Sequence, residues 1–209
     1  MSQSSRKRIM VMLSVFFPLS EAIKQLILAN MPDGYRVWYF PFQLCSMPAY
    51  LLPLAMLTRN DKMKKLLLCF LGDFMLVGGV AVLFDTSGMF YDVPILTVHS
   101  FLWHGRMILL ALLILTGTDY DTASGMSVKE SMLYLFLALV AQAFNILLRR
   151  YGQIDMFYIS PFTKMRQVVF SDIAGALGDI PAKAIYMMAT LIAAMLVKQA
   201  VRIIKLRRR

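Results

Sequence analysis

Long apolar stretches, separated by short clusters of charged residues, restrict the fold of this chain more than any other feature. Of its 209 residues, 59% are hydrophobic and only 16% are charged, whereas a soluble domain carries about 25% charged residues. An apolar run of about 20 residues is long enough to cross a bilayer as a helix. The sequence therefore predicts an all-α, polytopic membrane protein. It forms a single domain over residues 1–209, with about six transmembrane helices at about 9–30, 38–57, 66–84, 94–116, 129–148 and 182–204.

The positions of the charges predict an orientation. The net charge is +10, and the basic residues gather at 6–8, 59–65 and 202–209, next to the ends of apolar runs, whereas the 85–92 loop is acidic. Basic short loops favour the cytoplasmic side and contact with anionic lipid. We expect a multi-pass protein of the cell membrane with both termini cytoplasmic, with phospholipids as partners and without nucleic-acid binding. The oligomeric state stays open.

Charged side chains also decide how the first apolar run is interpreted. A basic cluster followed by an apolar stretch from Ile9 is similar to a signal peptide, but Glu21 and Lys24 follow in the same helical run. We therefore expect a retained first helix. In the second helix, Pro41 stands in the first turn and Pro48 and Pro53 lie inside, which predicts a kinked or partly unwound span.

The two cysteines, Cys45 and Cys69, both lie inside apolar runs. Neither forms a CxxC pair or stands at metal-ligand spacing from a histidine, so we expect no metal, no other cofactor and no disulfide framework. A buried cysteine most often acts as a small hydrophobic residue, and Cys69 fits that interpretation.

Polar residues of several predicted spans share a depth in the membrane. With a rise of about 1.5 Å per residue, they fall about 6–18 Å from the outer helix ends. Such residues are costly in hydrocarbon and mark sites or cavities. Glu21 and Lys24 are three residues apart and can pair, and Asp73 and Arg106 are expected to form a buried ion pair. The residues at this depth are Glu21, Lys24, Cys45, Asp73, His99, His104, Arg106 and Asn145.

A cysteine and a histidine at one depth permit covalent acyl chemistry. The histidine takes the thiol proton, and the thiolate attacks an acyl carbon to form a thioester. His99, Trp103 and Arg106 share one helix face, whereas His104 lies about 140° around the helix from His99, which leaves two candidate bases. The amides of Gln43 and Asn145 are candidates to hold an oxyanion or orient the histidine. Their alternative role is hydrogen bonding between helices.

Several segments carry a family resemblance over roughly residues 35–195. The Pro41–Cys45 segment, PFQLC, resembles the Pro-Leu-Gln/His-Leu-Cys segment of the YwaF-like integral membrane family, which includes the animal transmembrane protein 164-type acyltransferases. The Phe101–Gly105 segment is similar to the family's aromatic-rich His-Gly segment. Asn145, the stretch from Gly152 to Tyr158 with Pro161, and Gly178–Pro181 with Tyr186 resemble later family patterns.

The resemblance implies a membrane protein that transfers fatty acyl chains between phospholipids. It implies Cys45 as the acyl acceptor and His104 as the base, with Gln43, Asn145, His99, Trp103 and Tyr158 as substrate-positioning, oxyanion or orienting residues. A hydrolase acting on lipids would use the same residues. Two alternatives remain: a non-catalytic transporter or small-molecule-binding protein that uses the same polar cavity, and a structural subunit of a membrane complex.

Overall fold

The computed structural model describes residues 2–32 and 34–207, and all regular secondary structure in that part of the chain is helical. Asp33, in the predicted turn at 31–34, and Arg208 and Arg209, in the predicted basic terminus, lie outside the described residues. The described α-helices are α1 (Gln3–Ala29), α2 (Pro48–Leu57), α3 (Asp61–Ala81), α4 (Pro94–Leu115), α5 (Ser124–Leu148), α6 (Phe170–Leu177) and α7 (Asp179–Arg207).

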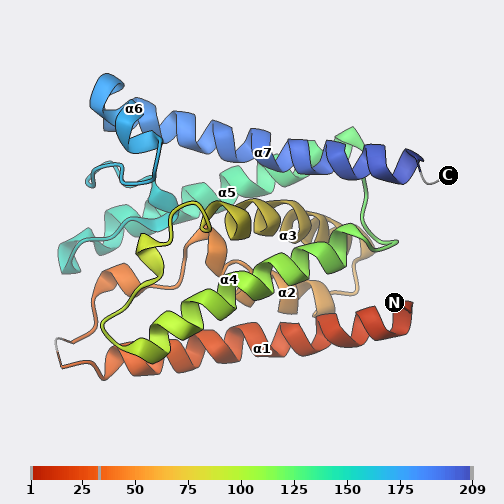
Figure 1. Ribbon diagram of the computed structural model, residues 1–209, viewed down its shortest axis with the longest axis horizontal. Helices are drawn as coiled ribbons and strands as arrows, with labels where there is room; N and C mark the ends of the chain where they lie inside the picture. Colours follow the sequence, from red (N-terminus) through yellow and green to blue (C-terminus); the bar gives the residue numbers. More distant parts are fainter. Residues whose placement is uncertain (1, 33, 208–209) are drawn as a thin grey trace.

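The long helices run up and down a bundle, and both ends of the chain lie at the same end of it (Figure 1). The α2–α3 and α4–α5 connections share that end, which we call the terminal end. Four segments are long and apolar enough to cross a membrane: Gln3–Ala29, Pro94–Leu115, Ser124–Tyr151 and Asp179–Arg207. The shorter apolar segment Leu44–Leu57 and the charge-bearing helix α3 complete the bundle.

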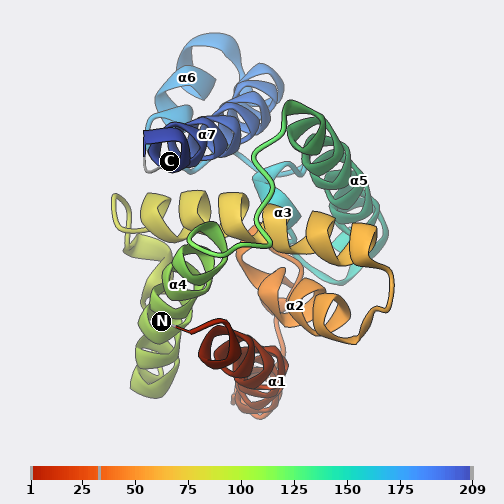
Figure 2. The ribbon, with the colours of Figure 1, turned by 90° about the vertical axis from the view of Figure 1, so that its right-hand side faces the viewer.

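Helix α3 is the centre of the bundle. It contacts α2, α4, α5 and α7, and Figure 2 shows it between the α1, α2 and α4 group and the α5 and α7 group. Its side chains from Leu67 to Met75 are all buried, with Phe70 and Phe74 stacked at 4.4 Å between ring centroids. Large apolar side chains of the surrounding helices face outward instead, as expected for helices in lipid.

Local sequence signals explain where several helices begin. Asn60 caps α3 by accepting hydrogen bonds from the backbone N–H groups of Lys62 and Met63, so α3 starts five residues earlier than the predicted 66. The second span is broken as the prolines predicted. Short 3₁₀ turns at Val37–Tyr39 (η1) and Leu44–Ser46 (η2) precede α2, and Pro48 opens α2 at a position that needs no N–H.

The connection between α5 and α7 is more ordered than its mixed composition suggested. It contains the 3₁₀ turns η4 (Arg149–Tyr151) and η5 (Met156–Tyr158) and the helix α6, which packs on α7. Gly178, with φ of 91°, separates α6 from α7. Phe157 and Tyr158 also have positive φ, 58° and 57°, a conformation that side chains with a Cβ rarely adopt and that neighbouring contacts must hold in place.

Candidate functional site

Cys45 lies in the first turn of a broken span. It belongs to η2, directly before α2, and its side chain is partly buried. The first N–H groups of a helical segment have no partner inside the helix, so this position favours a negative charge. The Trp103 indole of α4 donates to the Cys45 carbonyl at 2.8 Å and packs edge-on against Phe17 of α1. Two neighbouring helices therefore fix the position of Cys45.

A lysine stands at the centre of this region. Lys24 Nζ is 2.9 Å from Glu21 Oε1, which confirms that these two α1 side chains pair. The charge of Lys24 acts on the Cys45 thiol and on both histidines, His99 and His104. Lys24 thus pairs with Glu21 and lies within electrostatic range of predicted polar residues of η2 and α4.

The two histidines differ in which ring nitrogen is engaged. His104 Nδ1 is 2.8 Å from the Ser100 carbonyl oxygen. A carbonyl only accepts hydrogen bonds, so this nitrogen carries the proton and Nε2 keeps its lone pair. His99 Nε2 pairs with the Ser20 hydroxyl at 2.9 Å, and its ring lies against Trp103. Within the described residues, no hydrogen bond joins the Cys45 thiol to either imidazole.

The side-chain amides of Gln43 and Asn145 bind backbone groups at 155–157, and their oxyanion or orienting role stays a prediction. The Gln43 amide donates to the Asp155 carbonyl and accepts from the Phe157 N–H, both at 2.8 Å. The Asn145 amide accepts from the Met156 N–H at 2.6 Å and donates to the Met156 carbonyl at 3.1 Å. Each amide therefore makes two hydrogen bonds to backbone groups, and together they tie Gln43 and helix α5 to the turn at 155–157.

These contacts hold the strained turn that carries Tyr158. Tyr158 lies near Trp38 and Tyr186, with ring centroids 6.5 and 6.4 Å away, and the charge of a Cys45 thiolate would act on its hydroxyl. Asp155 at the start of the turn accepts from the Ser160 N–H and the Thr163 hydroxyl. Burial raises the pKa of the Asp155 carboxyl, and these hydrogen bonds oppose that rise.

The expected Asp73–Arg106 ion pair is wrong. Asp73 Oδ2 lies 3.0 Å from Lys198 Nζ of α7, and the Arg106 guanidinium stacks over the Phe16 ring at 4.2 Å. Asp73 belongs to a second polar cluster with Tyr120 of the α4–α5 connection and Glu130 of α5. The tertiary packing of α7 against α3 decides this pairing, because it places a buried base next to Asp73.

The sequence comparison gives the family of the chain. The family model described as the TMEM164 family matches residues 1–198. The chain belongs to the TMEM164 family. A search of curated proteins and a search of solved structures each found no match. Together with the apolar helices, membership identifies this TMEM164-family chain as a multi-pass membrane protein in contact with lipid.

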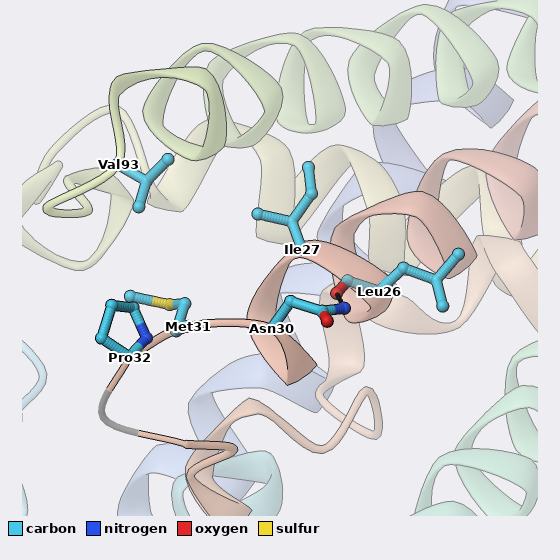
Figure 3. A pocket seen from close by; sticks show the side chains of 6 residues that line it. All are labelled: Leu26, Ile27, Asn30, Met31, Pro32 and Val93. Atoms are coloured by element: carbon cyan, nitrogen blue, oxygen red, sulfur yellow. Dashed lines mark hydrogen bonds between the residues drawn. The ribbon is translucent and has the colours of Figure 1, made fainter.

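This TMEM164-family protein also has an open apolar groove of about 510 Å³ between the end of α1 and the start of α4 (Figure 3). In Figure 3, Val93 faces Ile27 and Met31 across it. Cys45 and the two histidines are not among its lining residues, so the groove is separate from the Cys45 region. Among the described residues, no group of three or more His, Cys, Asp or Glu side chains is placed to hold a metal ion.

The sequence reasoning missed two polar networks of this TMEM164-family protein. One is the Asp73 cluster, completed by Tyr120, Glu130 and Lys198. The other surrounds Lys183, whose ammonium group donates to the carbonyls of Ser160 and Thr163 and holds the connection before α6. Three of these residues, Glu130, Lys183 and Lys198, lie inside predicted apolar spans. A charged residue inside such a span needs a buried partner, and this pattern could have revealed both networks.

Proposed function

We propose that this TMEM164-family protein is a membrane-embedded lipid acyltransferase or lipid hydrolase that acts through an acyl-thioester on Cys45. The observation that carries the proposal is the environment of the Cys45 sulfur. It lies in the first turn of a helical segment, in the field of Lys24, and its own backbone N–H and the Ser46 side chain act on it as hydrogen-bond donors. Each of these features stabilises a thiolate, whereas burial, the largest effect, and the charge of Glu21 favour the thiol. A base is therefore needed to take the proton during the attack.

His104 is the proposed base because the resemblance to the family assigns it that role and its unprotonated Nε2 has no hydrogen-bond partner among the described residues. His99 Nε2 is engaged by the Ser20 hydroxyl. In the first step, His104 Nε2 accepts the thiol proton, and the sulfur attacks the carbonyl carbon of a lipid ester. The tetrahedral oxyanion collapses, the carbon–oxygen bond breaks, and the leaving alkoxide takes the proton back from His104. The products are an acyl-thioester on Cys45 and a lysolipid.

The second step releases the acyl group. The hydroxyl of another lysolipid gives its proton to His104 and attacks the thioester. The carbon–sulfur bond breaks, the Cys45 thiolate takes the proton back from His104, and the transferase product leaves. If water attacks the thioester instead of the lysolipid hydroxyl, the product is a free fatty acid and the enzyme acts as a hydrolase. Among the described residues, His104 is not hydrogen-bonded to Cys45, and catalytic hydrogen bonds commonly tighten only in the complex with substrate.

Mass spectrometry of the protein reconstituted in phospholipid nanodiscs can detect the thioester directly. Intact-mass spectrometry should find one acyl adduct, which hydroxylamine removes, on the wild type and on Cys69→Ala. The adduct should be absent from Cys45→Ala, and His104→Ala should form it at least about tenfold more slowly, since general-base catalysis contributes about 10²–10⁴-fold. Equal turnover of lipid by wild type and Cys45→Ala refutes the proposal. That result, combined with ligand binding, would favour the transporter or binding-protein alternative.

A further inference from the structure

The buried cluster on α3, α5 and α7 contains one more acid than base. Lys198 Nζ lies 3.0 Å from Asp73 Oδ2 and 3.0 Å from Glu130 Oε1. The three residues are 1%, 0% and 3% exposed, respectively. With both carboxyl groups ionised, the core of a membrane bundle would contain an uncompensated negative charge, which is strongly unfavourable in a low-dielectric interior.

The hydrogen bonds of the cluster leave one acceptor unsatisfied. The Lys198 ammonium group has three N–H bonds but four oxygen atoms within 3.3 Å: the Asp121 carbonyl (2.9 Å), Asp73 Oδ2 (3.0 Å), Glu130 Oε1 (3.0 Å) and the Tyr120 hydroxyl (3.3 Å). The Tyr120 hydroxyl in turn donates to Asp73 Oδ1 at 2.5 Å. Asp73 Oδ2 is buried with no hydrogen-bond donor, although it is close to the Lys198 charge.

One bound proton would remove both the excess negative charge and the unsatisfied acceptor. Asp73 Oδ2 and Glu130 Oε1 each lie 3.0 Å from Lys198 Nζ, so the two carboxyl oxygens are at most 6.0 Å apart. Two carboxyl groups this close in a buried site favour a single bound proton over two negative charges. One proton would neutralise the cluster and give Asp73 Oδ2 its missing donor. We propose that Asp73 and Glu130 hold one shared proton at neutral pH, so that this cluster is a buried proton-binding site next to Lys198.

The other groups around the cluster do not supply the missing positive charge. Lys205 donates to the Gly117 and Tyr120 carbonyls, and Lys65 lies 3.8 Å from Asp121 Oδ2, at the edge of the cluster. α2 contains no charged residue, and the one charged residue of α4, Arg106, stacks over Phe16. The remaining titratable neighbours are Cys69 of α3, Tyr120 and Asp121 of the α4–α5 connection, and Tyr134 of α5.

The site would tie the stability of the terminal end of the bundle to proton concentration. The unfolded chain releases carboxyl protons above about pH 4.3, while the folded chain would keep one. Between the pH at which the unfolded chain loses its carboxyl protons and the higher pH at which the folded cluster loses its shared proton, the folded state binds more protons than the unfolded state. The free energy of unfolding therefore falls as the pH rises through this range. This proposal concerns residues away from Cys45 and does not depend on the acyltransferase proposal.

Infrared spectroscopy of the purified protein in nanodiscs tests the shared proton. We expect the carbonyl band of a protonated carboxyl group at neutral pH in wild type, and its loss in Glu130→Gln and in Asp73→Asn. The control Glu21→Gln removes an acid that is already paired one-to-one with Lys24, so it should leave the band unchanged. Absence of the band in wild type, or a band that survives both cluster variants, overturns the proposal.

Thermal unfolding as a function of pH provides a second measurement, and its first test needs only wild-type protein. The midpoint of wild type should fall as the pH rises from neutral into the alkaline range. Glu130→Gln, whose amide imitates the protonated carboxyl, should lose most of that fall. A wild-type midpoint that is independent of pH overturns the proposal. Replacing sodium by a bulky organic cation should leave the carboxyl carbonyl band and the thermal midpoint unchanged. A band that appears only without sodium would show that the cluster binds a metal cation, and would overturn the proposal.

Discussion

Replacing Lys198 by methionine tests how strongly the buried cluster holds the bundle together. Lys198 is 1% exposed and is the shared partner of Asp73, Glu130 and Tyr120. Methionine keeps much of the volume but removes the charge, leaving two carboxyl groups without a cation. Removing one partner of a buried ion pair costs about 3–5 kcal/mol.

That cost can be expressed as a change in thermal midpoint. For a chain of this size, 1 kcal/mol corresponds to about 2–4 °C, so Lys198→Met should lower the midpoint by about 6–20 °C. Acid should reduce the loss, because both carboxyl groups of the variant can then be protonated. The assay is thermal unfolding in detergent micelles or nanodiscs, followed by intrinsic fluorescence at two pH values.

Two further variants make the result specific. Lys205→Met removes a neighbouring lysine that is only partly buried and bonds carbonyl oxygens at the rim, so we expect a loss of at most about 1 kcal/mol. The double variant Lys198→Met/Glu130→Gln removes one base and one acid, and should recover at least half of the loss. A Lys198→Met midpoint equal to that of Lys205→Met, or a double variant whose losses simply add, would refute the reasoning.

Four other substitutions have expected outcomes. Asn145→Leu removes both hydrogen bonds to Met156 and should destabilise the protein by about 2–4 kcal/mol, since a buried donor and acceptor lose their partner; faster hydrogen exchange over residues 155–160 than over α4 would locate the effect, and uniform exchange would contradict it. Gly79→Ala places a Cβ 2.6 Å from Ile108 and should cost about 1–3 kcal/mol in thermal unfolding. The matched Gly105→Ala meets nothing within 4 Å and should be neutral or stabilising by about 0.5–1 kcal/mol; equal midpoints for the two would exclude close α3–α4 packing. Trp103→Phe removes the donor to the Cys45 carbonyl and should cost about 0.5–1.5 kcal/mol while slowing adduct formation at Cys45; an unchanged rate would mean that this hydrogen bond does not position the thiol.

Much of the helical architecture could be predicted from the pattern of apolar residues. The predicted spans at 9–30, 94–116 and 129–148 overlap α1, α4 and α5 closely, because an apolar run of membrane length has few other stable conformations. The break in the second span lies before Pro48, which opens α2, whereas Pro53 lies inside α2. Helix ends were less predictable: the Asn60 cap and the short helix α6 depend on local hydrogen bonds that hydropathy does not record.

The sequence by itself determined that the chain crosses a membrane, that its polar residues inside apolar spans would need partners, and which cysteine carries the family motif. Only the tertiary structure decided the partners: Asp73 with Lys198 instead of Arg106, and Gln43 and Asn145 with the backbone of η5. The physical reason is that burial makes a partner obligatory without specifying which one. The rotation and register of helices far apart in the sequence specify it, and those are set by packing around α3.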